Sequence, residues 1–194
     1  MSGYIAAIYF AASAGAPMEL AEEAVLETGR GLVGDRYHSG TGTYSADLEG
    51  LPDFQLTLLE IEEIRRFNIE RRLQLNPGDL RRNVVTRGVR LKDLIGARFT
   101  LGGATLEGIR MCEPCAYLAR KVSPRILPDL VHRTGLRAAI LAGGNIRIGD
   151  KIVRVENQTD AIGVFERPTT EDPCATQAQL GTAMNGRPEG HAET

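Results

Sequence analysis

Glycines that separate short β-prone runs at intervals of about eight residues constrain the fold of this chain most strongly. Residues 83–110 read NVVTRGVRLKDLIGARFTLGGATLEGIR, and glycines at 88, 96, 102, 103 and 108 divide them. Short runs rich in β-branched and aromatic residues, separated by turn residues, are typical of a barrel or a strongly bent sheet. We therefore expect a mainly β fold of the α+β class, with a few helices.

The 194 residues are enough for one domain with a normal core and a tail. Residues 1–160 contain the segments with regular patterning, whereas residues 161–194 are rich in Pro, Thr, Gly, Ala and acidic residues without a period. We expect one domain over 1–160 and a disordered tail over 161–194. The pattern also predicts a helix from Leu59 to about Leu73 and a closing strand pair, 137–142 with 150–155.

Charge, hydropathy and cysteine usage limit the class of protein. A net charge of −2 gives no broad attraction to nucleic acid or to an anionic membrane. No apolar stretch approaches the roughly 20 residues of a membrane span. A secretory signal needs a positively charged residue before its apolar core, and no Lys or Arg precedes Arg30. Three cysteines do not make a disulfide framework. We expect a cytoplasmic protein that binds neither membrane nor nucleic acid.

The segment IRMCEPCAYL, residues 109–118, contains the residues most able to do chemistry. A strand ends near Arg110 and a more helical segment begins after Pro114, so Cys115 is predicted at a strand-to-helix junction. Free N–H groups at a helix start favour a thiolate and lower a thiol pKa. Three alternatives stay open: a pair of buried core cysteines, a structural zinc site, which needs four ligands, and a redox pair, which normally has a βαβ context.

Three polar stretches are further candidates for a binding or catalytic site. GDRYH at 34–38 places Arg36 and His38 beside a glycine-rich loop, and DLRRNVV at 79–85 places Arg81 and Asn83 before a buried strand. Arginine pairs well with anions, and asparagine both donates and accepts hydrogen bonds. His132 could exchange protons near neutral pH. Each stretch also has a purely structural explanation, such as a turn with an internal ion pair or an ordinary surface histidine.

In their order along the chain, these stretches resemble the MOSC family, named for the C-terminal domain of molybdenum-cofactor sulfurase, and its short standalone bacterial members in particular. The matching segments are GLVGDR at 31–36, QLTLLEIEEI at 55–64, PGDLRRNVVTRGV at 77–89, CEPC at 112–115 and GNIRIGD at 144–150. The resemblance covers about residues 3–155. It implies a β-barrel with a few helices.

The resemblance also implies a site. The principal family cysteine falls on Cys115, which in related reductases ligates the molybdenum of a pterin cofactor, and the segment lining that site carries over to Arg81 and Asn83. Other members have been proposed to carry sulfur as a persulfide. Arg82 departs from the proline of the reductases, and Glu113 places an acid inside the cysteine motif.

We expect Cys115 to be the reactive residue and the molybdenum ligand, if that metal is bound, with His38 and His132 as proton-transfer candidates. The expected ligand-binding residues are Arg81, Asn83, Arg36 and Cys112. The expected partners are a small-molecule or cofactor ligand and a sulfur-donor or electron-transfer protein, and pyridoxal phosphate is not expected. The alternative function is a binding module for an anionic small molecule without turnover, in which the CxxC is structural.

Overall fold

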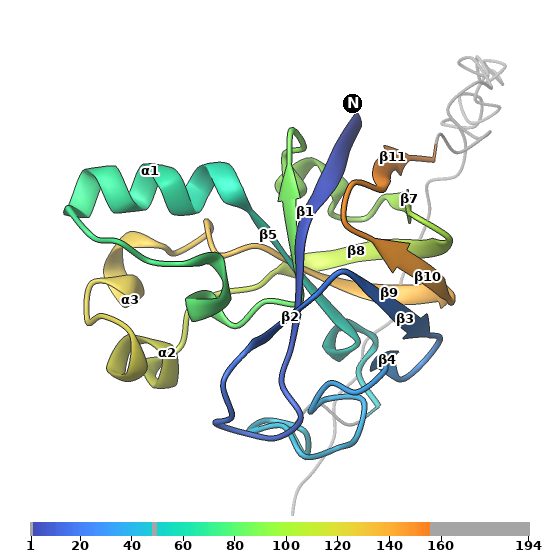
Figure 1. The fold of residues 1–194 in the computed structure, drawn as a ribbon, viewed down its shortest axis with the longest axis horizontal. Helices are drawn as coiled ribbons and strands as arrows, with labels where there is room; N and C mark the ends of the chain where they lie inside the picture. The colour runs from blue at the N-terminus through green and yellow to red at the C-terminus, as the bar shows by residue number, and fades with distance from the viewer. Residues whose placement is uncertain (1, 48–49, 156–194) are drawn as a thin grey trace, which may run out of the picture. The chain divides into compact units, whose positions relative to one another are not determined.

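The computed structural model describes residues 2–47 and 50–155, which form eleven β-strands and three α-helices (Figure 1). The strands are β1 (Ser2–Phe10), β2 (Glu19–Ala21), β3 (Glu23–Glu27), β4 (Gly31–Leu32), β5 (Leu56–Glu60), β6 (Val84–Arg87), β7 (Arg98–Leu101), β8 (Ala104–Met111), β9 (Leu136–Ala142), β10 (Gly144–Arg147) and β11 (Lys151–Arg154). The helices are α1 (Ile61–Arg71), α2 (Ala116–Lys121) and α3 (Ile126–Asp129). The expected mainly β fold is confirmed. The predicted tail, 161–194, lies outside the described residues.

Seven of these strands form a closed barrel in the order β11-β7-β8-β9-β5-β6-β1, because β11 pairs with β1 as well as with β7. Strands β5 and β6 run parallel, and the other neighbouring strands of the barrel are antiparallel. Strand β1 has three partners: Ser2–Tyr4 pair with β11, Tyr4–Ile8 with β6 and Ile8–Phe10 with β2. Strands β10, β3 and β4 make a separate small sheet.

The barrel interior is filled by apolar side chains from alternate strand positions. On β5, Leu56 and Leu58 belong to the barrel core, whereas Leu59 faces the opposite way, into a second cluster. Phe99 of β7 is also fully buried in the barrel. Each large side chain buried in this way stabilises the fold by roughly 1.5–3 kcal/mol.

The second apolar cluster holds the helices, which gather on one side of the barrel (Figure 1). Helix α1 contributes Ile64 and Phe67, which lie one turn apart on the same face. Leu118 of α2 and Ile126 of α3 complete the contact. The predicted helix after β5 is therefore confirmed. The half-buried Cys115 packs at the edge of this cluster.

The predicted closing strand pair is wrong. Both segments are strands, but β9 lies between β5 and β8, and β11 lies between β1 and β7. The residues between them, expected to be a connecting turn, form β10 and pair with β3. The predicted hairpin paired strands that are neighbours in sequence. In the structure, the backbone N–H and C=O groups at the edges of these strands are paired by closure of the barrel.

Candidate functional site

Cys115 lies where the sequence predicts it, between the end of β8 and the start of α2. Its backbone is extended, at φ −127 and ψ 163, and its carbonyl accepts the first hydrogen bond of the helix from the Ala119 N–H at 3.0 Å. The helix has six residues, so its dipole is small.

Cys112 has different surroundings from Cys115. It is 1% exposed, and both cysteines are free thiols. The Cys112 N–H donates to the Gly135 carbonyl at 2.8 Å, and its own carbonyl accepts from the Thr134 hydroxyl. Gly135 has a φ of +110 and approaches the backbone of β5 too closely for a side chain. These contacts make Cys112 a fixed core residue.

Arg82 holds the CEPC loop in place. Its guanidinium donates to the carbonyls of Thr134 at 3.0 Å, Cys112 at 3.2 Å and Glu113 at 3.3 Å. The position where the related reductases have proline thus carries a side chain that fixes the backbone between the two cysteines. The sequence shows Arg82 only as a departure from a pattern and gives no sign of this role.

The Cys115 side chain borders a small cavity of about 60 Å³, which is room for only a few water-sized groups. Four arginines line it: Arg36, Arg81, Arg82 and Arg137. No Asp or Glu is among the described residues of this lining. We call this cavity the Cys115 pocket. Its charge is strongly positive, in a chain whose net charge is −2.

Arg81 is almost fully buried, at 8% exposure, and has a left-handed backbone with φ 56. Its guanidinium donates to the Ala16 carbonyl at 2.7 Å. Burial, together with the nearby charge of Arg36, lowers the pKa of Arg81. Within residues 2–47 and 50–155 it makes no ion pair with a carboxylate. Arg81 thus carries a buried charge that forms no ion pair with any acid in the described part of the chain.

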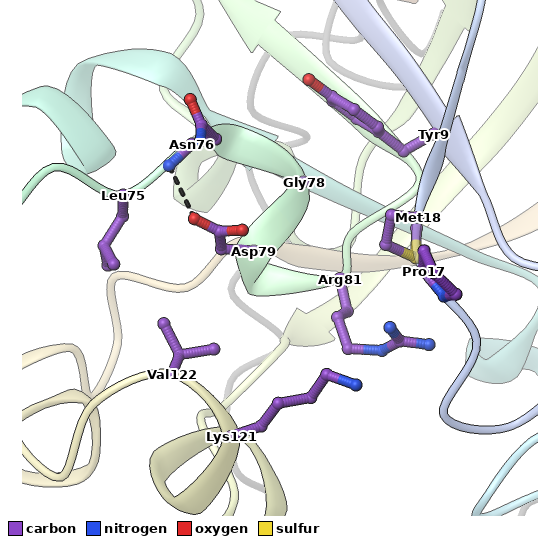
Figure 2. A pocket seen from close by; sticks show the side chains of 10 residues that line it. All are labelled: Tyr9, Pro17, Met18, Leu75, Asn76, Gly78, Asp79, Arg81, Lys121 and Val122. Carbon is purple, nitrogen blue, oxygen red and sulfur yellow. Dashed lines mark hydrogen bonds between the residues drawn. The ribbon is translucent and has the colours of Figure 1, made fainter.

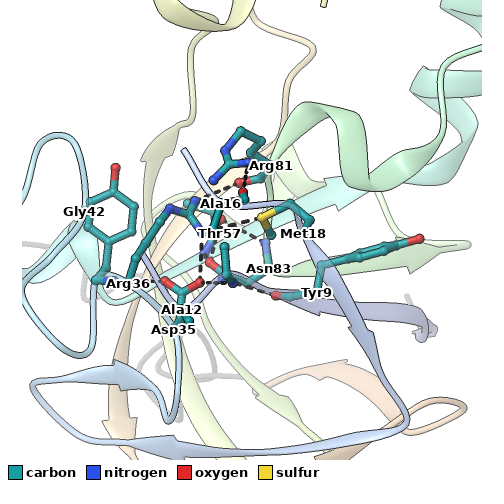
Figure 3. A network of polar contacts seen from close by, with 12 residues as sticks. Tyr9, Ala12, Ala16, Met18, Asp35, Arg36, Gly42, Thr57, Arg81 and Asn83 are labelled. Atoms are coloured by element: carbon teal, nitrogen blue, oxygen red, sulfur yellow. Dashed lines mark hydrogen bonds and ion pairs between the residues drawn. The ribbon is translucent and has the colours of Figure 1, made fainter. Parts of the chain in front are cut away.

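Arg36, by contrast, is neutralised and fixed. Its guanidinium pairs with Asp35 at 2.9 Å and donates to the Arg81 carbonyl at 3.3 Å, as Figure 3 shows. The Asp35 carboxylate also accepts from the N–H groups of Ala11 and Tyr37. Arg36 therefore joins two loops and holds Arg81 in its unusual backbone conformation.

Asn83 does not line the Cys115 pocket. Its amide oxygen accepts from the Thr57 hydroxyl at 2.8 Å, and its amide nitrogen donates to the Tyr9 carbonyl at 3.3 Å (Figure 3). Both ends of the side chain thus join β6 to strands β5 and β1. The structure brings Arg81 to the pocket and uses Asn83 to fix the strand that follows.

The two candidate histidines lie outside the lining of the Cys115 pocket. His38 contacts the Glu27 carboxylate at 2.9 Å, and this hydrogen bond lowers the pKa of Glu27. His38 also borders a separate cavity of about 500 Å³. The His132 ring is exposed and contacts Glu113 at 2.6 Å. Glu113, an acid within the cysteine motif, is thereby engaged by His132.

Two residues of the pocket, Arg137 and Tyr44, were not predicted from the sequence. Arg137 lies on β9, and its Nε–H is buried without a hydrogen-bond partner in the described part of the chain. Tyr44 lines the same pocket as Cys115, and the interaction with Cys115 raises the pKa of Tyr44. Tyr44 is the one aromatic residue in the polar loop 38–53, a signal that could have identified it. Arg137 sits in an apolar strand and gives no such signal.

A larger cavity of about 560 Å³ also has Arg81 in its wall (Figure 2). Lys121 lines it too, and the side chains of Arg81 and Lys121 extend into the same space. Lys121 donates to the Gly15 carbonyl at 3.1 Å, next to the carbonyl that Arg81 contacts. Cys115 is not part of its lining.

The described residues contain neither a cluster of metal-ligating side chains nor a helix suited to cross a membrane. No group of three or more His, Cys, Asp and Glu side chains among them could hold a metal ion. None of their helices combines the length and the apolar character that crossing a membrane requires.

Comparisons with solved structures show the fold, and a comparison with family models shows the family. No curated protein matches the chain. Among solved structures, the YuaD protein of Bacillus subtilis superposes with a TM-score of 0.69 at 17% identity, covering 81% of this chain and 98% of that one. YiiM of Geobacillus stearothermophilus gives 0.62 at 16%, covering 79% and 75%, and YiiM of Escherichia coli gives 0.57 at 19%, covering 79% and 70%.

At these identities the structural likeness shows the fold alone. The family follows from the sequence, because the model of the MOSC domain matches residues 45–153, more than half of the chain. The match includes the cysteine motif and its Arg82 clamp. The chain therefore belongs to the MOSC domain family.

Proposed function

We propose that this MOSC-domain protein is a sulfur carrier in which Cys115 accepts a sulfur atom and holds it as a persulfide. The observation that carries the proposal is a half-buried thiol in a cavity lined by four arginines and, among the described residues, by no acid. Positive charge close to a sulfur favours its ionised form. A thiolate is the nucleophile that sulfur transfer needs.

The size of the Cys115 pocket supports a sulfur atom as the cargo. A persulfide adds one sulfur to the side chain, and a volume of about 60 Å³ has room for it. A persulfide is anionic near neutral pH, so the same guanidinium groups stabilise the loaded form. In this proposal Cys115 is the nucleophile, and Arg81 and Arg137 bind the anion. We assign no step to His38 or His132.

The pterin-bound molybdenum implied by the family fits this site only in part. One thiolate is a suitable ligand for a soft, redox-active metal. Cofactor sites, however, have volumes of about 300–1,000 Å³, well above that of the Cys115 pocket. The larger cavity has such a volume, yet Cys115 does not line it. The residues around Cys115 therefore do not fit the whole cofactor, and we derive no step through it.

Mass spectrometry and elemental analysis of freshly isolated protein, purified without reductant, test this proposal. We expect part of Cys115 to carry the added mass of one sulfur atom, which a reductant removes. Molybdenum with copurified pterin, and no sulfur adduct, would favour the cofactor instead. An unmodified Cys115 that no sulfur donor can load would leave the alternative, a binding module for an anionic small molecule.

Two matched substitutions separate the cysteines. Cys115→Ser should abolish persulfide formation and leave the melting temperature nearly unchanged, because the side chain is half-buried and the change is small. Cys112→Ser should retain loading and cost about 1 kcal/mol of stability, because it places a hydroxyl in a buried site. The reverse order would show that the family cysteine has been assigned to the wrong residue.

The compartment and partner belong to the same proposal. We propose that the protein works in the cytoplasm, where a sulfur donor renews the persulfide on Cys115. An electron-transfer partner would be needed only if molybdenum were bound. Pull-down with Cys115→Ser as the control tests whether that donor is a protein, and no thiol-dependent partner is expected if a small molecule is the donor.

A further inference from the structure

Three of the arginines in the Cys115 pocket lack a compensating acid. Arg81, Arg82 and Arg137 make no ion pair within residues 2–47 and 50–155, whereas Arg36 is paired with Asp35. Arg82 donates from Nε and Nη2 to three carbonyls, which hold its guanidinium against the CEPC loop. Among the described residues, Arg81 and Arg137 each donate to one carbonyl, so these two arginines keep the most donors for a ligand.

Arg137 has a donor ready for an acceptor. Its Nη1 donates to the Asp53 carbonyl at 3.4 Å, which is a weak contact, and its Nε–H is buried with no partner among the described atoms. A buried donor without an acceptor is costly, and native structures rarely keep one without reason. An anion in the pocket would satisfy this donor and offset the charge of Arg81.

We infer that the sulfur donor is a small dianion of the thiosulfate class, with a sulfane sulfur attached to an oxyanion leaving group. This inference rests on the proposed function. The pocket limits the donor to a few heavy atoms, and its uncompensated guanidinium groups select a doubly charged species. The oxyanion oxygens accept from Arg81 and Arg137, and the outer sulfur faces Cys115.

The reaction balances without an added oxidant or reductant. The Cys115 thiolate, having lost its proton to solvent, attacks the outer sulfur of thiosulfate, and a new sulfur–sulfur bond forms. The bond between that sulfur and the sulfonate sulfur breaks, and sulfite leaves with the electron pair. The products are the Cys115 persulfide anion and sulfite, so total charge is unchanged.

The test compares two donors on the full chain carrying Cys174→Ser, which removes the tail thiol as a second acceptor. Thiosulfate should load Cys115 and release an equal amount of sulfite, measured by peptide mass spectrometry and a sulfite assay. Glutathione persulfide, whose body is too large for the pocket, should load it more slowly. Sulfate should slow loading by thiosulfate more than chloride of equal ionic strength, and this comparison needs no variant.

Two arginine variants sharpen the test. Arg137→Gln and Arg81→Gln should each slow thiosulfate loading about tenfold or more, and glutathione persulfide loading far less. Arg147→Gln is the matched control, because Arg147 is exposed and lines none of the three cavities. Loading by glutathione persulfide but not by thiosulfate would overturn the dianion inference and leave the sulfur carrier intact. Loading by neither donor would overturn both, and equal slowing of both donors by the arginine variants would also contradict the inference.

Discussion

Two regions of this molecule differ in whether a buried or half-buried arginine has an acidic partner. Beside α1, Arg133 pairs with Glu63 at 2.7 Å and with Glu70 at 3.0 Å. In the Cys115 pocket, Arg81 is more deeply buried and has only a carbonyl as its hydrogen-bond acceptor. The first arrangement neutralises its charge within the fold, whereas the second leaves the charge for a ligand.

The pKa values follow the same contrast. Burial lowers the pKa of Arg133, but hydrogen bonds to Glu70 and Glu63 outweigh it and the net pKa is raised. For Arg81, burial and the nearby charge of Arg36 both lower the pKa. We therefore expect Arg133 to contribute to stability and Arg81 to contribute to anion binding, and the substitutions below test this difference.

The largest expected effect is on stability, at Arg82, which lacks an acid but holds three carbonyls. Arg82→Ala should lower the free energy of unfolding by about 2–4 kcal/mol, because it leaves polar groups of the CEPC loop without donors. Urea unfolding measures the change, and alkylation mapping should find Cys112 newly reactive. Arg90→Ala, at an exposed arginine in a long ion pair, should cost less than about 0.5 kcal/mol. Equal costs for the two would contradict the clamp.

Arg133→Ala should lower the free energy of unfolding by about 1–2 kcal/mol, because Glu63 and Glu70 lose their shared partner in a partly buried site. The loss should shrink at high salt, since screening weakens the wild-type pairs. Alkylation of Cys115 should be unchanged. A change in Cys115 reactivity would show that the two regions are coupled.

Arg81→Gln should change the free energy of unfolding by less than about 1 kcal/mol without an anion, because a buried charge without an acid contributes little to stability. Glutamine keeps a donor for the Ala16 carbonyl. The same substitution should remove the stabilisation that sulfate or thiosulfate gives the wild type, measured as a melting-temperature shift. A large loss of stability with anion binding retained would reverse our assignment of the two regions.

The smallest effect is expected at Tyr44. Tyr44→Phe should change the alkylation rate of Cys115 a few-fold, because it removes the hydroxyl that contacts the thiol. The raised pKa of Tyr44 gives a second readout: the contact with neutral Tyr44 is present below its ordinary pKa and is lost as pH rises through the raised value. In Cys115→Ser, spectroscopic titration should show one tyrosine ionising at lower pH. An unchanged titration would mean that Tyr44 does not contact the thiol.

Local signals in the sequence predicted the elements of the fold well. The helix after β5, the position of Cys115 and the barrel follow from periodicity, turn residues and the family pattern. Pairing was less predictable, because β9 and β11 find their partners across the barrel and not across the turn between them. Contacts that depend on the closed barrel cannot be inferred from spacing.

The site was predicted only in part, for a similar reason. Arg81 and Cys115 share the pocket as expected, although they are far apart in sequence. His38 and His132 were predicted as proton-transfer candidates because their contacts with Glu27 and Glu113 become apparent only in three dimensions. Arg137 reaches the pocket from a strand of apolar residues, and nothing local distinguishes it from a solvent-facing arginine.

The most direct test of the central claim compares alkylation of Cys115 by iodoacetate, which is anionic, with alkylation by iodoacetamide, which is neutral. Peptide mapping follows Cys115 alone, and free glutathione gives the reference ratio of the two rates. We predict an iodoacetate-to-iodoacetamide ratio well above the reference in the wild type, falling toward it in Arg81→Gln and Arg137→Gln. A wild-type ratio at or below the reference, or a Cys115 that neither reagent reaches, would contradict an anion-binding pocket at a reactive sulfur.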